Sequence, residues 1–536
     1  MLQRHIFSAG PLPLLAASLV LALATACAPP PRPSLPAAPP VAPRIDHHEQ
    51  LFQADEMLRR GCYECLRDAL AGYEALQTDP ELGAQAHDSA VRASLLLALR
   101  ENELGLVSSG YLERARRLLG PVETASPELP GLVDIAEVIA NGPVGYTRSA
   151  STDGQIANML TIARSQEPWA TVLRNLMPQD LTASYLWLTL ACGPGGSRFP
   201  GHEQRAEVLR SVAVIPLFAQ KFATTCGLTS SEPLEAMLAI EPRFGELNYY
   251  LGLFALGGQT GRAPDLDGAD ARFRAAWAWR QEWPTLSLAI AGVAMSAEDF
   301  PRAFEFYDRT LRMVPDDPDA LVGTIRALTY ANRHAEALAA ADRLIATNHN
   351  VGEAHYWKAM NFVRLKDDGQ AWTEVEEASK SLSNFDVPKL AGIIAINRRE
   401  YATAQQRLEM AVRRWKGDCE TQYYLQAVLS EQRDWDAAAR VAADAGACFE
   451  TQEGTIEQEL ATVRAAQMAP ERRARLQARL EAQLVSNARM RATAWYNAAA
   501  ANFNLSRADE ARRYAEKVAA DTFYGDRAKT LLERLK

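Results

Sequence analysis

The chain has 536 residues, of which 48% are hydrophobic, 23% charged and 8% aromatic. This composition is typical of folded globular proteins and excludes a chain that is disordered throughout. Its 57 Lys and Arg residues against 66 Asp and Glu residues leave a net charge of −9. Such a balance argues against nucleic-acid binding, because phosphate affinity comes mainly from basic surface. The length allows roughly two to four ordinary domains or one long repeat array.

Residues 1–26 have the pattern of a secretory signal peptide. Arg4 supplies the positive charge, and residues 11–24 (PLPLLAASLVLALA) supply an apolar stretch that is short for a transmembrane helix. Because the letters ATAC that end at Cys27 resemble the bacterial lipobox, we expect Cys27 to carry lipid and to become the mature N-terminus. The alternative is an ordinary secretory signal cleaved near Ala26, with the cysteine incidental.

Residues 27–45 join this signal to the rest of the chain, and nearly half of segment 28–44 (APPPRPSLPAAPPVAPR) is proline. Such a stretch favours extended polyproline II, which at about 3.1 Å per residue spans about 50 Å. We interpret it as a stiff spacer between a lipid anchor and a folded body. Ala28 stands where an Asp would resemble an inner-membrane retention signal, so the outer membrane is favoured, with the protein facing the periplasm.

Beyond residue 46 the pattern is helical. Apolar residues recur at i, i+3, i+4 and i+7 through segments of about 12–15 residues, and Pro or Gly falls between the segments. No run shows the alternation and turn residues that mark a β-strand. Short helical segments with short connections predict antiparallel helix pairs.

One alanine marks a repeat in the second half of the chain. Its successive spacings are 34, 34, 34, 33 and 34, and the last occurrence follows after 73, which corresponds to two repeats with a small insertion. The alanines are Ala269, Ala303, Ala337, Ala371, Ala404, Ala438 and Ala511. A small residue twelve positions earlier, which would let two helices approach closely, is present at Ala291, Ala359, Gly392 and Ala499. Ile325 and Gln426 depart from this pattern.

The pattern resembles the tetratricopeptide repeat (TPR), a helix–turn–helix unit of about 34 residues with small residues at the same two places. The resemblance implies an all-α, right-handed helical solenoid over 242–536. It includes a charged helical insertion near 449–490 and a final helix over 524–536 that caps the last repeat. Residues 46–241 stay helical but lose the register of the repeat. We interpret them as divergent repeats of the same solenoid, and a separate helical domain is the alternative.

Six cysteines follow Cys27, and an even number in an exported chain suggests disulfide bonds. In the repeat register, Cys419 begins the first helix of one unit and Cys448 ends its second helix. These two ends lie side by side in a helical hairpin, so we expect a bridge between them. Cys192 and Cys226 are separated by one repeat length, which suggests equivalent places on neighbouring units and a second candidate pair.

No pattern of catalytic or metal-binding residues stands out. The eight histidines are scattered, and the chain has no HExxH motif, Walker loop, GxSxG motif or dinucleotide fingerprint. Cys62 and Cys65 form a CxxC motif without a βαβ pattern, which favours a structural pair or buried thiols over a redox site. His334 takes a repeat position usually held by an aromatic, so packing explains it better than catalysis. We expect no catalytic site, metal or cofactor; an enzyme with a site hidden in 129–241 is the weaker alternative.

In the TPR family one face of each first helix lines a concave groove. Tyr356, Tyr423 and Tyr496 share one position on this face, and Tyr249 matches it locally. Exposed tyrosines suit partner binding because they combine a large apolar face with a hydroxyl group. The alternative is that tyrosine is simply common at this place in such repeats. Neighbouring groove positions hold residues that could hydrogen-bond a peptide or carboxylate, namely Arg326, Arg364 and Asn397.

Together these features predict a non-catalytic scaffold of the bacterial cell envelope. It would bind an envelope protein or peptide segment, contact the membrane by its lipid anchor only, and bind no nucleic acid. The alternative function is an accessory component of an envelope transport system that presents a solute or a solute-binding protein. A deep apolar cavity within 129–241 would favour that alternative.

Overall fold

In the computed structural model, the described residues are 46–120, 126–140, 167–192, 199–200, 202–224, 226, 230–257, 264–384 and 386–536. The chain divides into two units, Met1–Asp46 and His47–Lys536, and all helices of the described residues belong to the second unit. The signal peptide, the lipidated Cys27 and the proline-rich linker predicted for residues 1–45 lie outside the described residues.

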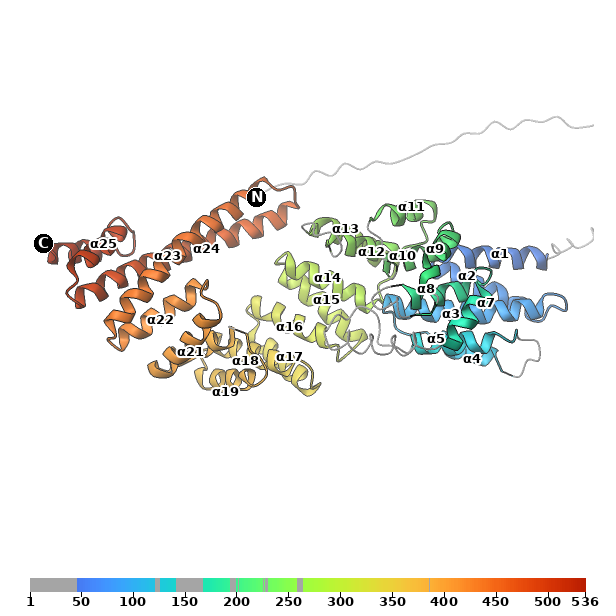
Figure 1. The fold of residues 1–536 in the computed structure, drawn as a ribbon, viewed down its shortest axis with the longest axis horizontal. Helices are drawn as coiled ribbons and strands as arrows, with labels where there is room; N and C mark the ends of the chain where they lie inside the picture. Colours follow the sequence, from blue (N-terminus) through green and yellow to red (C-terminus); the bar gives the residue numbers. More distant parts are fainter. Residues whose placement is uncertain are drawn as a thin grey trace, which may run out of the picture. The chain divides into compact units, whose positions relative to one another are not determined.

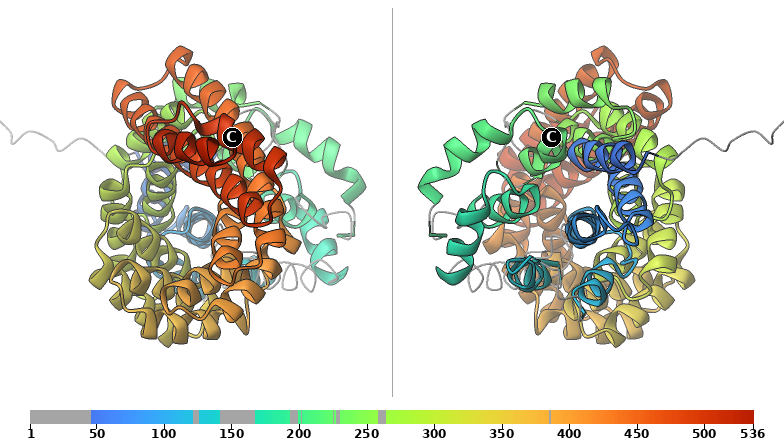
Figure 2. Two further views of the ribbon diagram at one scale, coloured as in Figure 1. Left: turned by 90° about the vertical axis from the view of Figure 1, so that its left-hand side faces the viewer. Right: turned by 90° about the vertical axis from the view of Figure 1, so that its right-hand side faces the viewer.

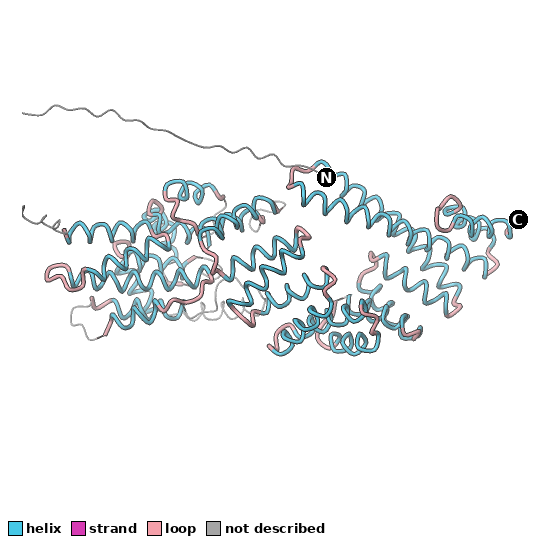
Figure 3. Tube along the Cα trace, turned by 180° about the vertical axis from the view of Figure 1, so that it is seen from behind, coloured by secondary structure: helices cyan, strands magenta, loops and turns pink. Residues whose placement is uncertain are grey.

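The described residues form α-helices joined by loops and short 3₁₀ turns, and they contain no β-strand (Figures 1 and 3). The helices of the N-terminal half are α1 (His47–Arg60), α2 (Tyr63–Ala75), α3 (Gly83–Leu104), α4 (Tyr111–Leu118), α5 (Leu129–Ala140), α7 (Glu167–Leu176), α8 (Leu181–Ala191), α9 (Arg205–Val212), α10 (Ala219–Thr224) and α11 (Glu232–Ile240). Helix α3 contacts α2, α4, α5 and α8, so it lies at the centre of this half.

From residue 247 onward, successive helices pack in antiparallel pairs, which follow one another along a curved path (Figure 2). They are α12 (Leu247–Ala255), α13 (Leu266–Trp279), α14 (Pro284–Ser296), α15 (Phe300–Met313), α16 (Pro318–Tyr330), α17 (His334–Ala346), α18 (Val351–Arg364), α19 (Asp368–Ser379), α20 (Asp386–Asn397), α21 (Tyr401–Arg414) and α22 (Cys419–Glu431). The even-numbered members from α14 to α22 are the first helices of the predicted repeats. Together with the hairpin that follows, these pairs make the array that we call the repeat array.

The predicted insertion extends two helices of the repeat array into one long hairpin. Helix α23 (Trp435–Ala465) has 31 residues and α24 (Pro470–Asn504) has 35, whereas α15 and α21 have 14 each. The base of the hairpin continues the repeats, and α25 (Ala508–Val518) packs on α24. The final helix, α26 (Gly525–Arg534), packs on α25 and covers Trp495 and Ala499 of the last repeat.

The turns inside the six helix pairs from α14–α15 to α24–α25 each contain a residue with positive φ that is not glycine. Their spacing follows the alanine register, and they are Glu298, Asn332, Lys366, Arg399, Arg433 and Ser506. In each case the next backbone N–H donates to the carbonyl five residues earlier, as from Asp299 to Ala294 over 2.8 Å. This left-handed turn satisfies carbonyls that the helix end leaves without partners. The shared turn geometry gives the second helix the same exit direction in these six pairs.

The repeat alanines lie where the paired helices touch. Ala303, Ala337, Ala371 and Ala404 are fully buried, and a Cβ added at Gly392 would lie 2.6 Å from Leu408 Cγ. The departures are accommodated differently: Ile325 is buried in the apolar core, while buried Gln426 donates to Tyr423 O over 3.0 Å and accepts from Asn497 Nδ2 over 3.1 Å. Small residues at the predicted positions therefore do set the close approach of these helices.

One hydrophobic cluster runs through the N-terminal half and the first pairs of the repeat array. It includes Leu51 of α1, Leu97 of α3, Trp187 of α8 and Trp283 and Val293 of the array. The two halves therefore share an apolar core rather than meeting through a polar boundary. None of the described helices has the length and apolar character required to cross a membrane.

Candidate partner-binding surface

The three groove tyrosines lie on the first helices of their pairs, and all three are half-buried. Burial raises the pKa of Tyr356 on α18 and that of Tyr423 on α22 above their usual range. The Tyr423 ring also lies 6.3 Å from Phe449 of α23, centroid to centroid. Tyr496 on α24 stacks on Tyr524 beside the final helix at 5.0 Å. Each tyrosine thus combines packing with a partly accessible ring.

Tyr249 does not belong with these three. Its side chain is 3% exposed, and its ring lies 5.0 Å from Trp283, 5.3 Å from Tyr250 and 6.0 Å from Phe273, centroid to centroid. The sequence around Tyr249 resembles that around the other three tyrosines, but the turn before α14 places Trp283 against the Tyr249 ring. Tyr249 is a core residue and offers no surface to a partner.

Exposed polar residues mark the C-terminal part of the same first helices. Arg326 of α16, Arg364 of α18 and Asn397 of α20 are all exposed. Asn397 Nδ2 donates to Asp368 Oδ1 over 2.9 Å, which holds the amide at the helix end. The two guanidinium groups belong to adjacent repeats and offer planar donor pairs suited to carboxylates or backbone carbonyls.

Acidic residues mark the N-terminal part of these helices, at one equivalent position in each: Asp319, Glu353, Asp386 and Glu420. Burial raises the pKa of Asp319, and the charges of Asp317 and Glu353 raise it further. Burial also raises the pKa of Asp386, against the opposing charge of Lys389. Lys389 Nζ lies 2.7 Å from Glu420 Oε2 and 3.0 Å from Asp418 Oδ2. The N-terminal ends of these first helices therefore carry a row of acidic side chains, part of whose charge Lys389 balances, while Arg326 and Arg364 lie nearer the C-terminal ends.

His334 has a structural contact, in line with the packing interpretation. Its Nδ1 lies 2.8 Å from Asn361 Oδ1, and the Asn361 amide donates to Thr329 Oγ1 and Trp357 O, each over 2.8 Å. Asn361 is fully buried and ties α16, α17 and α18 together. The available sequence signal was the place of Asn361 between the apolar residues Met360 and Phe362, because an amide packed among apolar side chains must find hydrogen-bond partners.

The six cysteines outside the signal segment form three disulfides. Cys419–Cys448 joins α22 to α23 with a Cα–Cα distance of 5.4 Å, and Cys192–Cys226 links two segments of the N-terminal half at 4.7 Å. The third, Cys62–Cys65, spans 4.9 Å at the start of α2.

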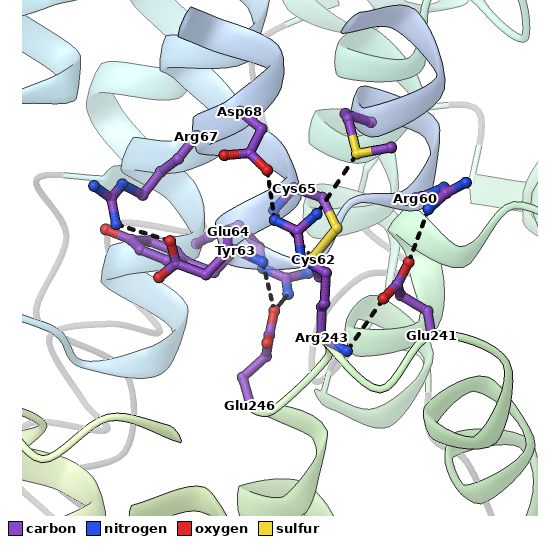
Figure 4. Close-up of a disulfide and its surroundings, with 12 residues drawn as sticks. Arg60, Cys62, Tyr63, Glu64, Cys65, Arg67, Asp68, Glu241, Arg243 and Glu246 are labelled. Carbon is purple, nitrogen blue, oxygen red and sulfur yellow. Dashed lines mark hydrogen bonds and ion pairs between the residues drawn. A yellow bond between two sulfur atoms is a disulfide. The ribbon is translucent and has the colours of Figure 1, made fainter. Parts of the chain in front are cut away.

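The surroundings of the CxxC motif argue for a structural role. Both cysteines are fully buried. Figure 4 shows segment 241–246 lying against them, with Tyr63 N donating to Glu246 Oε1 over 2.8 Å and Arg60 Nη1 3.3 Å from Glu241 Oε2. A redox site needs an accessible sulfur atom, and the arrangement at this motif does not offer one.

A group of buried charges in the N-terminal half was not anticipated from the sequence. Arg100 of α3 and Glu246 before α12 are fully buried, with Arg100 Nη2 2.6 Å from Glu246 Oε1. Burial raises the pKa of Glu246, against the opposing charge of Arg100. Nearby, Lys221 Nζ is paired with Glu103, which also accepts from Tyr185 OH over 2.5 Å. These pairs join helices that are far apart in sequence.

The described residues contain no group of three or more His, Cys, Asp or Glu side chains placed to hold a metal ion. One apolar pocket of about 340 Å³ lies between α9, α10 and α11, lined in part by Leu209, Phe222 and Met237. Part of the range 129–241, including 141–166 and 193–198, lies outside the described residues. The idea of an enzyme site hidden there is not tested.

Comparisons with known proteins identify the repeat. A family model for the tetratricopeptide repeat matches residues 294–361, from the end of α14 to α18. No curated protein matches the chain. Together with the helix pairs, the family match confirms the all-α, TPR-like fold predicted from the sequence, and proteins built from this repeat bind other proteins or peptides.

Several solved structures resemble parts of the chain at low identity. A tetratricopeptide repeat protein from Parabacteroides merdae is 12% identical, covers 54% of this chain and 98% of its own, with a TM-score of 0.33. PilF of Pseudomonas aeruginosa is 16% identical, covering 37% and 89%, with a TM-score of 0.32. PilW, a type IV pilus biogenesis factor, is 16% identical, covering 38% and 92%, with a TM-score of 0.34.

Proposed function

We propose that this chain is a non-catalytic scaffold of the bacterial cell envelope, anchored to the outer membrane by lipid on Cys27 and facing the periplasm. It holds an envelope protein or peptide segment against the first-helix face of its repeat array. The signal pattern and the proline-rich spacer support the anchor, and the repeat supports protein binding.

One observation carries the binding part of this proposal. The half-buried acidic residues Asp319, Glu353 and Asp386 recur at one equivalent place in α16, α18 and α20, so they form a row along the array, and exposed polar residues lie at neighbouring positions further along the same helices. Along α18 the acidic Glu353 comes first, the half-buried Tyr356 follows, and the exposed Arg364 ends the helix. Helix α16 carries Asp319 near its start and the exposed Arg326 further along. A surface of this kind offers acidic, aromatic and basic groups to an extended segment at the same time.

Replacing Arg326 and Arg364 together with Ala should weaken partner binding about tenfold while leaving the melting temperature nearly unchanged. Both side chains are exposed, so they support little of the core, whereas charged donors at an interface contribute about 1–2 kcal/mol. Crosslinked pulldown from the envelope with mass spectrometry would identify candidates, and titration of the purified partner would measure the affinity.

The matched control replaces Arg312 and Arg413, which are exposed on second helices and pair with Asp308 and Glu409. Proteins lost by the Arg326/Arg364 variant and kept by this control would support binding at the first-helix face. Equal capture by both variants would place the interface elsewhere.

The anchor has its own test. Cys27→Ser should abolish labelling of the protein by a clickable palmitate and release it from the outer-membrane fraction, because the lipid is proposed to sit on that sulfur. Labelling that persists in the variant would contradict the lipobox interpretation. The scaffold proposal would then need another means of retention.

The apolar pocket between α9, α10 and α11 favours a second candidate function, presentation of a small solute to a transport system. Its volume of about 340 Å³ is at the small end of ligand sites. A fluorescent apolar probe such as anilinonaphthalene sulfonate should bind the wild type, and Met237→Trp should weaken that binding by filling the pocket. Unchanged probe binding in the variant would count against a solute site here.

A further inference from the structure

The tip of the α23–α24 hairpin lies against the beginning of the repeat array. Figure 1 shows the hairpin running back toward α13, although the two are far apart in sequence. The tip loop contacts α13 directly: Ala469 N donates to Asp267 Oδ2 over 3.0 Å, and Arg472 Nη1 lies 3.1 Å from the same oxygen. The last and first parts of the array are therefore joined.

Further arginines of α24 continue the contact along the turn between α14 and α15. Arg475 Nε donates to Ala297 O over 3.1 Å, and Arg475 Nη1 lies 4.0 Å from Asp299 Oδ2. One turn further along the helix, Arg479 Nε lies 2.7 Å from Glu298 Oε1. Three arginines spaced about one turn apart along α24 thus lie beside three acidic side chains, Asp267, Asp299 and Glu298.

This contact is polar, and the hairpin does not depend on it for its own packing. The outer half of the hairpin has a separate apolar cluster of Ile456, Leu460, Val463 and Leu480. Between the tip and α13–α15 lies a cavity of about 550 Å³, lined by charged residues from both sides. The pairing side chains keep 17–35% of their surface exposed, so water and salt reach them.

We propose that the α23–α24 hairpin is a releasable strap. Closed, its arginines tie the end of the repeat array to Asp267 and Glu298 at its beginning. Ion pairs that water and salt can reach are individually weak and are partly screened by salt, so a tie made of a few such pairs and two hydrogen bonds can open. An apolar contact of the same extent would hold the two ends permanently.

Closure of the strap would restrict the first-helix face, the surface of α16, α18 and α20 that carries Arg326, Tyr356 and Arg364. Curvature of a repeat array comes from small rotations between neighbouring units, and helices α14–α22 lie between the two tied ends. A closed strap limits these rotations, whereas an open strap lets the face widen around a partner. The consequence for partner binding rests on the proposed function; the strap itself does not.

Hydrogen exchange of the detergent-solubilised full-length protein tests the strap without any partner. In Arg472→Gln, the Ala469 amide and segment 297–300 should exchange about tenfold faster than in the wild type, while the inner repeats keep their protection. Raising the ionic strength from about 0.05 M to about 1 M should have the same effect on the wild type. Arg464→Gln is the matched control, because Arg464 pairs with Glu481 inside the hairpin.

The charge-swapped variant Asp267→Arg with Arg472→Asp should restore slow exchange of segment 297–300 if the ion pair closes the strap, whereas the Ala469 amide loses its acceptor in this variant and should stay fast. Unchanged exchange in Arg472→Gln and at high salt, or loss of protection spread through the whole array, would overturn the proposal. With an identified partner, Arg472→Gln should also raise the apparent affinity, up to about tenfold if nine-tenths of the wild type is closed. Absence of any partner would defeat the proposed function but leave the exchange result intact.

Discussion

Replacing Arg100 with Ala should lower the free energy of unfolding by about 3–5 kcal/mol. Arg100 and Glu246 are both fully buried, and their charged atoms lie 2.6 Å apart. Removing the guanidinium group leaves a carboxylate in the core without its counter-charge. The loss should spread beyond α3, because Glu246 also accepts from Tyr63 N over 2.8 Å and precedes α12.

Urea denaturation of the purified protein would measure the effect, with Arg67→Ala as the control. Arg67 pairs with Glu64 at 2.8 Å on the surface of α2, and such pairs contribute at most about 1 kcal/mol. The double variant Arg100→Met with Glu246→Gln should recover much of the loss, because no charge remains buried. A loss for Arg100→Ala no larger than for Arg67→Ala would contradict this account.

The loss of stability caused by Arg100→Ala should become smaller as the pH falls. Burial raises the pKa of Glu246 in the folded protein, and loss of the neighbouring arginine would raise it further. A carboxyl group whose folded pKa lies above its unfolded pKa destabilises the protein when ionised, and this cost disappears as the pH falls through the folded pKa. The Arg100→Ala variant should therefore regain stability relative to the wild type on mild acidification.

The repeat array is predictable from the sequence because its packing is periodic and local. Ala303 and Ala371 mark contacts between helices only a few residues apart, so each repeat carries its own signal and the series reinforces it. The left-handed turns between the paired helices could not be predicted, because no residue type marks them in the sequence. Glu298, Lys366 and Arg433 are not residues that usually take positive φ, so their identity gives no warning of the conformation.

The contacts that join distant parts of the chain could not be predicted. Arg100 with Glu246 and Arg472 with Asp267 are pairs of common charged residues, and nothing in their spacing distinguishes them from solvated surface charges. For the candidate surface, the register placed Arg326 and Tyr356 on first helices, but exposure depends on what packs against each helix. Tyr249 shows this most clearly, because its burial comes from Trp283, which follows the next helix.

Trp283→Ala should cost about 3–5 kcal/mol, the usual range for deleting a buried aromatic side chain. The indole is fully buried just before α14, and its Nε1 donates to Leu104 O over 2.5 Å at the end of α3. It also packs against Tyr249 at 5.0 Å and Trp279 at 5.7 Å, centroid to centroid. One side chain thus fills the core shared by both halves and satisfies a helix-end carbonyl of the N-terminal half.

The variant also tests whether the N-terminal half and the repeat array unfold together. If they share one core, Trp283→Ala should shift a single thermal transition, and amides of α3 and α14 should lose protection in parallel. Trp283→Phe should cost less, because a ring remains while the hydrogen bond to Leu104 is lost. Two separate transitions, with only the array affected, would favour an independent N-terminal domain that meets the repeats without depending on them.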